Sequence, residues 1–491
     1  MLDRPTILFL ALIPSDYSPY LASDYGMERS FDLMPHKLSI LMLTAWLREH
    51  GCDGHYVWAN APDDEGMKVF IDAVEKINPN AIGFSLVTEE MMSNYKAVEK
   101  LKEVYPEIPI IVGGPHPTAL PEHTIENFPA IDFVSVGEGE KTLEEFLTAV
   151  SSGAGKDEIE KIPGLCFKTE NSRIVNTGAR ICIEDINILP DPAYDLLFRP
   201  GTHPDKSTAF PLVCSYGCYF RCTFCSVPHG HYRALNPVRV VDRIERVNKQ
   251  YGVEYFAIRD SFWPPRRDWL DRFCDEVEKR GLKISFHFQT RAGTCTLEQF
   301  ERLKKIGAKA TAIGVEAGDP DVLKSIKKSI TLNMARRTMS DMNKVGIFSI
   351  AFFIFGNLGE TRRTIQASID FSKELNSSVV FYHVLYPLPG SEAFLSLPDD
   401  KKSWWMHGTL PSICDLEVRE LESLSREAFL RYPLRWAYLT QHVLGGKLTP
   451  EFRAIARRFY LVHLKKYSLG IAERSKFLRV VIHGLKRIFR G

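Results

Sequence analysis

The sequence predicts an α/β protein, with an N-terminal doubly wound, Rossmann-like domain, then a partial (β/α)6 barrel of the TIM type and a helical C-terminal region. Apolar runs typical of buried parallel strands recur along the first 400 residues, helical patterns separate them, and the strand-like runs stop near Pro398. With 491 residues, of which 45% are hydrophobic and 25% charged, the chain has room for two or three domains. This composition excludes the collagen-like and disordered classes.

The first 150 residues alternate between strand-like and helix-like segments. The strand-like segments are residues 6–13, 81–87, 108–112 and 133–136, and the helix-like segments are residues 38–50, 89–104 and 142–150. This alternation predicts a doubly wound sheet in residues 1–150, and such sheets bind ligands beyond the carboxyl ends of their strands. Residues 151–204 are rich in turn signals and are expected to form a connecting segment.

A second alternation predicts the barrel in residues 205–397. Its strand-like segments are residues 210–214, 255–259, 284–289, 310–315, 349–355 and 379–385, with helical patterns between them. Six β/α units of this kind predict a barrel or partial barrel, whose chemistry lies at the carboxyl ends of the strands. Residues 398–491 carry only helical patterns, so we expect a helical C-terminal region there.

Four of the ten cysteines, Cys214, Cys218, Cys222 and Cys225, lie directly after the first barrel strand. The last three have C-x3-C-x2-C spacing, and three thiolates on one loop can hold three irons of a [4Fe–4S] cube while the fourth iron stays open. A closed zinc site commonly uses two separated ligand pairs, and no matching second C-x2-C pair follows. The spacing therefore favours a cluster, with a zinc or structural iron–sulfur site as the alternative. Cys214 is more typical of a small buried thiol.

This loop, which has Phe224 before its last cysteine, resembles the signature of the radical S-adenosylmethionine (SAM) family. The resemblance implies that the open iron chelates SAM and that an electron from the cluster cleaves SAM to a 5′-deoxyadenosyl radical. It continues at later strand ends, where residues 314–318 are similar to the G-x-E-x-G segment of the family, although residues 355–361 depart from its usual G-L-P-G-E-T. The SAM contacts that it implies are Phe224, Asp260, Arg291, Gly314 and Glu316.

Two glycine-rich turns, at residues 113–118 and 137–140, follow strands of the N-terminal domain. Glycine lets a ligand approach the backbone closely, and the second turn opens a helix whose free N–H groups favour anions. Ordinary βα turns share this pattern. Before a radical SAM segment, these turns and residues 35–51 resemble the cobalamin-binding domain of B12-dependent radical SAM enzymes. The cobalamin contacts that this resemblance implies are Ser85, Thr88, Gly113, Gly114, Pro115, His116, Gly137, Glu138 and Gly139.

The D-x-H-x-x-G motif of other cobalamin domains is missing after the first strand. The resemblance therefore leaves the lower axial position of cobalamin open to water or to no ligand. His116 is a candidate ligand, although a hydrogen-bonded turn histidine is the more ordinary interpretation.

The two resemblances together imply an enzyme with a [4Fe–4S] cluster, SAM and cobalamin as cofactors. An adenosyl radical can abstract hydrogen from an unactivated carbon, and cobalamin can then deliver a methyl group to that carbon. The leading hypothesis is therefore methyl transfer to a hydrophobic small molecule or lipid, with a low-potential electron donor such as flavodoxin or ferredoxin as partner. The alternatives are oxidative cyclisation or rearrangement, as in the anaerobic tetrapyrrole cyclases that the chain also resembles, and a non-catalytic corrinoid or iron–sulfur sensor.

The formal net charge of +1 conceals a basic C-terminal end. Residues 451–491 hold eleven Lys and Arg against two acids, so they carry +9 and the preceding residues carry −8. The preceding residues, with their net negative charge, show no helix-turn-helix, so we expect no nucleic-acid partner. Residues 476–490 have apolar side chains at helical spacing opposite basic ones, a pattern typical of a helix that contacts an anionic membrane or of one that packs on the barrel.

The N-terminal residues lack the basic region and cleavage site of a secretory signal, and no apolar run reaches the length of a membrane span. These features predict a cytoplasmic protein, placed at the inner face of the membrane if the basic helix binds there.

Overall fold

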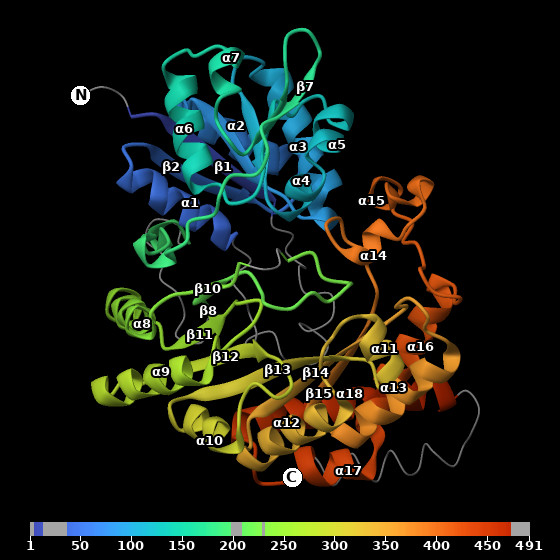
Figure 1. The fold of residues 1–491 in the computed structure, drawn as a ribbon. Coiled ribbons are helices and arrows are strands. Elements are labelled where there is room, and N and C mark those ends of the chain that lie inside the picture. Colours follow the sequence, from blue (N-terminus) through green and yellow to red (C-terminus); the bar gives the residue numbers. More distant parts are fainter. Residues whose placement is uncertain (1–3, 13–36, 198–208, 228–230, 473–491) are drawn as a thin grey trace.

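The computed structural model describes residues 4–12, 37–197, 209–227 and 231–472. An N-terminal α/β domain stacks on a barrel-like domain, and the last helices of the C-terminal region pack against the barrel, away from the N-terminal domain (Figure 1). Both parts of the predicted α/β architecture are confirmed. One hydrophobic core runs without a break from one face of the N-terminal sheet into the barrel, and a second core fills the other face of that sheet.

The N-terminal domain is built on a sheet with the strand order β2-β1-β3-β4-β5-β6-β7. Its first five strands are parallel, in the 2-1-3-4-5 order of one doubly wound class. They are β1 (Thr6–Leu12), β2 (Asp53–Ala59), β3 (Ala81–Ser85), β4 (Ile110–Gly113) and β5 (Phe133–Ser135). The sequence did not predict β2, because this edge strand mixes polar residues with only partial alternation.

The helices of this domain cover both faces of the sheet (Figure 1). They are α1 (Leu38–Glu49), α2 (Asp64–Ile77), α3 (Met91–Val104), α4 (Pro115–Ala119), α5 (Pro121–Asn127) and α6 (Glu140–Ser151). The side chain of Asp63 caps α2 by accepting a hydrogen bond from the N–H of Gly66, and Asn78 ends the same helix in a left-handed conformation.

The segment expected to connect the domains also contributes to the first sheet. Strands β6 (Leu165–Lys168) and β7 (Ile174–Asn176) extend it beyond β5 in antiparallel pairing. Leu165, Cys166 and Phe167 are fully buried. Both strands are short and surrounded by turn residues, so their pattern was hidden within the turn signals of residues 151–204.

The barrel-like domain holds six parallel strands in the order β15-β14-β13-β12-β11-β8. Each predicted strand is present with bounds that agree to within two residues. The strands are β8 (Phe210–Leu212), β11 (Tyr255–Ile258), β12 (Ser285–Thr290), β13 (Ala308–Glu316), β14 (Phe348–Phe355) and β15 (Val379–Val384). The main helices outside the sheet are α8 (Pro237–Tyr251), α9 (Arg267–Arg280), α10 (Leu297–Lys305), α12 (Leu332–Val345) and α13 (Arg362–Leu375). A small hairpin of β9 (Ser215–Tyr216) and β10 (Arg233–Ala234) lies near β8.

The C-terminal region is helical, as predicted. Helix α16 (Val418–Arg431) protects the open edge of the barrel, where the Ser425 hydroxyl donates to the carbonyl of Tyr382 over 2.5 Å. Helix α18 (Pro450–Ala472) packs beside it and buries Phe452 and Phe459. The basic helix expected at residues 476–490 lies outside the described residues.

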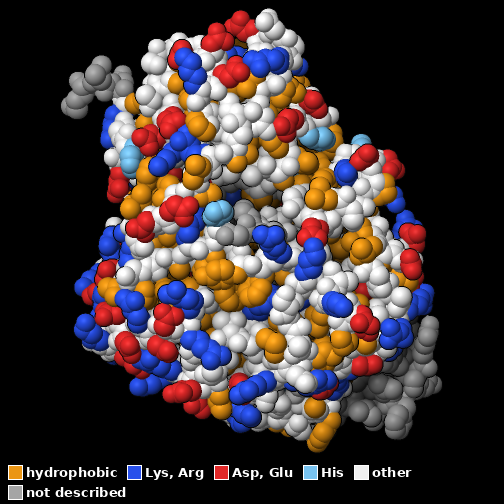
Figure 2. Space-filling model, in the orientation of Figure 1, with side chains coloured by type: hydrophobic (Ala, Val, Ile, Leu, Met, Phe, Trp, Pro, Cys, Tyr) orange, Lys and Arg blue, Asp and Glu red, His pale blue; other side chains and the backbone are white. Residues whose placement is uncertain are grey.

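Charge is distributed without a dominant basic surface on the face shown in Figure 2, where Lys and Arg alternate with Asp and Glu. Among the described residues, no helix is both long enough and apolar enough to cross a membrane.

Two helix-ending glycines allow a matched test of the barrel backbone. At Gly307, with φ of +117°, an added Cβ would lie 2.0 Å from the carbonyl oxygen of Ile284, whereas at Gly281, with φ of +61°, it would meet nothing within 4 Å. We expect Gly307→Ala to lower the free energy of unfolding by about 3 kcal/mol or more. Gly281→Ala should cost only about 1 kcal/mol. Thermal unfolding of the two variants measures the difference, and equal shifts would contradict this account of the backbone.

Candidate cofactor sites

A cavity of about 650 Å³ lies between the two domains, at the carboxyl ends of strands from both sheets. The N-terminal domain contributes the ends of β3, β4 and β5 and the first turns of α1. The barrel side contributes residues near β8, β9 and β11. The lining includes Ser39, Met42, Ser85, Gly113, Gly114, Pro115, Gly137, Glu138, Gly139 and Glu140 from the first domain, and Pro211, Tyr216 and Arg259 from the second. The size is in the usual range for a cofactor site.

Glycines shape the wall of this cavity. Gly114 has φ of +100°, and an added Cβ would lie 2.7 Å from the carbonyl oxygen of Leu86, so a side chain does not fit there. Gly137 has φ of +85°, and its Cβ would meet nothing within 4 Å. Because Gly137 lines the cavity, a side chain at this position would occupy space available to a ligand. The wall therefore suits a cofactor that lies against backbone.

The structure brings most of the predicted cobalamin contacts to this wall, but not Thr88 and His116. His116 is 1% exposed, its Nδ1 lies 3.1 Å from the hydroxyl of Thr88, and its ring lies 4.9 Å from that of Trp405 in α15 (Trp404–His407). Burial lowers the pKa of His116 to about 4, so the ring is neutral at pH 7. These contacts fit the turn-histidine interpretation and place His116 away from the cavity.

Sequence reasoning did not name several residues of the cavity wall as cofactor contacts, among them Met42, Tyr216 and Glu140. The Tyr216 hydroxyl donates to the sulfur of Met42 over 3.4 Å, which links α1 to the cysteine loop. Burial raises the pKa of Glu140 to about 7. The position of Tyr216 between Cys214 and Cys218 was the available signal, since a residue inside a cofactor loop lies near that cofactor.

The cysteine loop is fixed to the barrel through its backbone. The N–H of Thr223 donates to the carbonyl of Ile326 over 3.0 Å, and the carbonyl of Thr223 accepts from Ala393 over 2.9 Å. Burial raises the pKa of Cys225, the backbone N–H of Val227 lowers it, and the charges of Cys222 and Cys218 raise it further. In the described parts of the chain, no three His, Cys, Asp or Glu side chains converge as ligands of a single metal ion. The fit to a [4Fe–4S] cube therefore rests on three neighbouring thiols on one anchored loop.

Arg291 lies beside this loop. Its Nη1 is 3.8 Å from the sulfur of Cys222, and its guanidinium carbon is 3.7 Å from the ring centre of Phe220. The side chain is buried, and its Nη2 has no hydrogen-bond partner among the described residues. A buried guanidinium with a free donor can receive a carboxylate, as SAM carries.

Glu316 and Lys328 form a buried ion pair at the end of β13, with 2.6 Å between Oε1 and Nζ. An added Cβ on Gly314 would lie 2.1 Å from the same Glu316 oxygen, so Gly314 makes room for the pair. Lys328 Nζ also lies 5.7 Å from the ring centre of Phe224. These contacts join the predicted G-x-E-x-G segment to the cysteine loop.

Asp260 holds the start of the loop. One carboxylate oxygen accepts from the N–H of Cys214 over 2.8 Å, and the other accepts from the hydroxyl of Ser215 over 2.6 Å. Burial raises the pKa of Asp260 to about 7, while these hydrogen bonds lower it. In this structure Asp260 organises the loop, and its contact with SAM stays a prediction.

The turn that departs from the usual G-L-P-G-E-T is closed by Glu360. This carboxylate accepts from the N–H groups of Gly356 over 2.7 Å and Asn357 over 2.9 Å. The glutamate therefore organises the turn through backbone contacts that do not require the missing proline.

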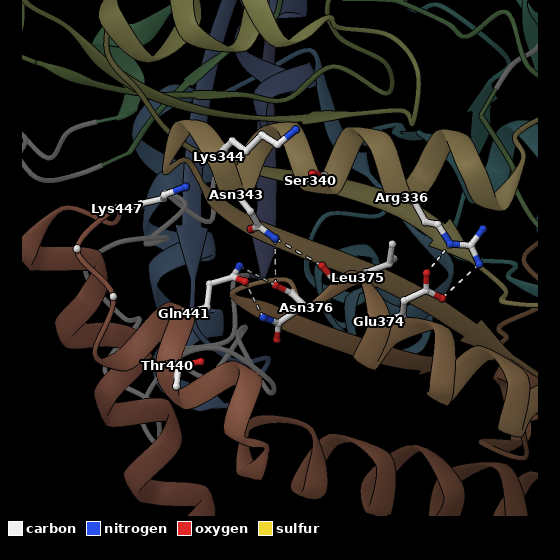
Figure 3. A pocket seen from close by; sticks show the side chains of 12 residues that line it. Arg336, Ser340, Asn343, Lys344, Glu374, Leu375, Asn376, Thr440, Gln441 and Lys447 are labelled. Carbon is white, nitrogen blue, oxygen red and sulfur yellow. Dashed lines mark hydrogen bonds and ion pairs between the residues drawn. The ribbon is translucent and has the colours of Figure 1, made fainter.

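A second cavity, of about 550 Å³, lies between the ends of α12 and α13 and the segment around Gly445 (Figure 3). Its amides bond to one another: Asn376 donates to Gln441 over 2.9 Å, and Asn343 donates to the carbonyl of Asn376 over 3.2 Å. Arg336 pairs with Glu374 at the other end of the view. This network joins the C-terminal region to the barrel, and none of the predicted cofactor residues lines it.

Two protein families match the chain in the places that the geometry indicates. Residues 29–147 match the B12 binding domain, and residues 212–372 match the radical SAM superfamily. The chain is a B12-dependent radical SAM enzyme. Its cofactors are a [4Fe–4S] cluster, SAM and cobalamin, and the neighbouring thiols and the glycine-lined cavity fit them.

Several curated relatives share most of the length of this radical SAM enzyme. An uncharacterized methyltransferase of Pyrococcus horikoshii is 26% identical over 400 residues, which are 79% of this chain and 86% of the relative. An anaerobic magnesium-protoporphyrin IX monomethyl ester cyclase of Rubrivivax gelatinosus is 27% identical, over 67% of this chain and 60% of the relative. A hopanoid C-3 methylase of Methylococcus capsulatus is 24% identical, over 77% and 74%.

The fold is shared with a solved structure of the radical SAM methyltransferase TsrM from Kitasatospora setae. The TM-score is 0.65 at 18% identity, and the match covers 80% of this enzyme and 75% of TsrM.

Gly137 and Gly153 offer a matched test of the cobalamin cavity. Both have positive φ, +85° and +73°, and an added Cβ would meet nothing within 4 Å at either, but only Gly137 lines the cavity. We expect Gly137→Ala to weaken cobalamin binding by about tenfold, because the methyl group takes up ligand space. Gly153→Ala should bind cobalamin as the wild type does, with a similar loss of thermal stability. Titration followed by cobalamin absorbance measures the affinity of both variants. Equal affinities of Gly137→Ala and Gly153→Ala for cobalamin would show that the cofactor binds elsewhere.

Proposed function

We propose that this enzyme transfers a methyl group to an unactivated carbon of a hydrophobic substrate, with SAM and cobalamin as cofactors. The observation that carries the proposal is the shared cavity. The glycine turns of the B12-binding domain and Tyr216 line the same space, and Cys218 follows Tyr216 by two residues. Methyl transfer requires the two cofactors to act on one substrate atom, and the position of Tyr216 in this wall supports a cluster site beside the cobalamin cavity.

When bound, the cluster with SAM supplies a radical that removes a hydrogen atom, and cobalamin supplies the methyl group. In this proposal the residues of the chain hold and orient the cofactors. Arg291 grips the SAM carboxylate with its free Nη2, and Phe220 keeps the guanidinium in place. The Glu316–Lys328 pair and Asp260 fix the shape of the surrounding loops, and the buried position of all three excludes water from them.

A cluster of aromatic rings in the barrel is compatible with a hydrophobic substrate. The rings of Phe352 and Phe381, on neighbouring strands, stack with their centres 5.7 Å apart, and the ring of His383 lies 5.5 Å from that of Phe352. Burial lowers the pKa of His383 and so favours its neutral form. The similarity to a hopanoid methylase, an enzyme named for a lipid substrate, points in the same direction.

Oxidative cyclisation is the second candidate, and the similarity to an anaerobic tetrapyrrole cyclase favours it. Both reactions begin with the same reductive cleavage of SAM, so both need a low-potential electron donor, and flavodoxin or ferredoxin suits either. A cytoplasmic location and contact with the inner face of the membrane through residues 476–490 stay predictions.

Removal of one predicted cluster ligand should abolish SAM cleavage. We expect Cys218→Ala to lower both bound iron and 5′-deoxyadenosine production by about 100-fold or more, since the cube loses one of three protein ligands. Cys214 is the matched control, because it is fully buried at the end of β8 and has a raised pKa that keeps the thiol protonated. Cys214→Ala should retain iron and SAM cleavage. Iron analysis, EPR and a product assay measure these outcomes. The assignment would be contradicted if Cys214→Ala lost iron and SAM cleavage while Cys218→Ala kept them.

The products distinguish methylation from cyclisation. After anaerobic reconstitution with candidate lipids or other hydrophobic compounds, a methyltransferase should form methylated product, 5′-deoxyadenosine and S-adenosylhomocysteine in equal amounts. Mass spectrometry measures all three. Deoxyadenosine and a modified product without S-adenosylhomocysteine would exclude methylation and support the cyclase reaction, whereas the absence of deoxyadenosine would support a non-catalytic sensor.

A further inference from the structure

An ion pair joins the cobalamin turn to the start of the cluster loop. Glu138 lies in the turn after β5, and Arg233 lies on β10 of the other domain. Nη1 of Arg233 is 3.0 Å from Oε2 of Glu138, and Nη2 pairs with Oε1, so the contact is bidentate. The Arg233 side chain is 10% exposed and that of Glu138 is 27% exposed. Nη1 also donates to the carbonyl of Ile183 over 2.5 Å, which holds the guanidinium from a second direction.

From Arg233 the connection continues into the cluster loop. Strand β10 pairs with β9 so that Arg233 lies opposite Tyr216 and Ala234 lies opposite Ser215. The guanidinium carbon is 5.6 Å from the ring centre of Tyr216. A Cβ added at Gly217 would lie 2.5 Å from the carbonyl oxygen of His231, so the two backbones approach closely just before Cys218. A displacement of the β9–β10 hairpin would therefore move the first cluster ligand.

The same hairpin reaches the SAM side of the site. Ser215 donates its hydroxyl to Asp260 over 2.6 Å. Glu138 and Tyr216 both line the cobalamin cavity. A ligand in the cavity would thus touch both ends of a connection that runs from the cobalamin turn through Arg233 to the cluster loop.

We propose that the Glu138–Arg233 pair couples the two cofactor sites, so that cobalamin binding strengthens SAM binding at the cluster and SAM binding strengthens cobalamin binding. Cobalamin would order Glu138 and Tyr216, and the bidentate pair would hold the hairpin in the position that the cluster loop needs. Arg233 is then a positioning residue, and Glu138 acts through it. The inference depends on the two cofactor assignments and not on methyl transfer.

Such coupling is reciprocal, because both routes to the doubly bound enzyme have the same total free energy. The factor by which cobalamin lowers the Kd of SAM must equal the factor by which SAM lowers the Kd of cobalamin. We expect a factor of about fivefold or more in the wild type.

Equilibrium titrations of the reconstituted enzyme test this. The cluster is kept in its oxidised state so that SAM is not cleaved, and each cofactor is titrated with and without the other. In Arg233→Gln, which removes the guanidinium at a position that does not line the cavity, we expect each cofactor to bind alone while the coupling factor falls to about one. Arg180→Gln is the matched control, because Arg180 forms a bidentate pair with Glu145 of α6 without reaching the barrel.

A coupling factor of one in the wild type, or an unchanged factor in Arg233→Gln, would overturn the proposal. Failure of either cofactor to bind the wild type alone would instead overturn the cofactor assignment beneath it. Hydrogen–deuterium exchange of the wild type provides a measurement that needs no variant. Cobalamin should slow amide exchange in residues 215–218 and 233–234 and leave exchange in β6 and β7 unchanged. If cobalamin left the exchange rates of the hairpin unchanged, the proposal would also be overturned.

Discussion

The meeting of two parallel sheets at their carboxyl ends is the constraint on which the rest of the structure depends. In each sheet the turns that follow the strands carry the chemistry, glycine-rich in one and cysteine-rich in the other. Because those ends share one cavity, Gly137 and Tyr216 become neighbours although they are far apart in sequence. The continuous core from the first sheet into the barrel holds this arrangement. A rotation of one domain would bury its turns against the other or expose them to water.

Buried carboxyl groups show how the loops are held in place. Asp260, Glu140 and Glu360 each lie in surroundings that raise their pKa to about 7, chiefly through burial. Asp260 and Glu360 offset part of that cost by accepting hydrogen bonds from backbone N–H groups in the turns they support. These two carboxyls replace water as the partners of their turns, so the turns keep their shape without solvent.

The strands of the barrel and the cysteine spacing could be predicted from the sequence because both are local patterns. Each barrel strand has apolar residues at most or at alternate positions, as in FSIAFFIF of β14 and SFHFQT of β12. Three cysteines on one loop need no knowledge of distant contacts. The edge strand β2 and the short strands β6 and β7 were not predicted, because partial burial and turn-rich surroundings weaken the hydrophobic pattern of a strand. The role of Arg233 was not predicted, for a different reason. Its role depends on Glu138, 95 residues away, and no periodicity reports such a pair.

The basic C-terminal end shows why charge counted along a chain is weak evidence of function. In α18, Arg457 donates to the carbonyl of Val443 over 3.2 Å and Arg453 donates to that of Leu448 over 3.0 Å. These guanidinium groups cap backbone carbonyls at the turn before the helix, while Phe452 and Phe459 on other sides of the same helix are buried. Part of the +9 charge therefore stabilises the fold and is not available to a lipid surface. Membrane contact through residues 476–490 stays a prediction, and a truncation that removes those residues tests it without removing the packed helix.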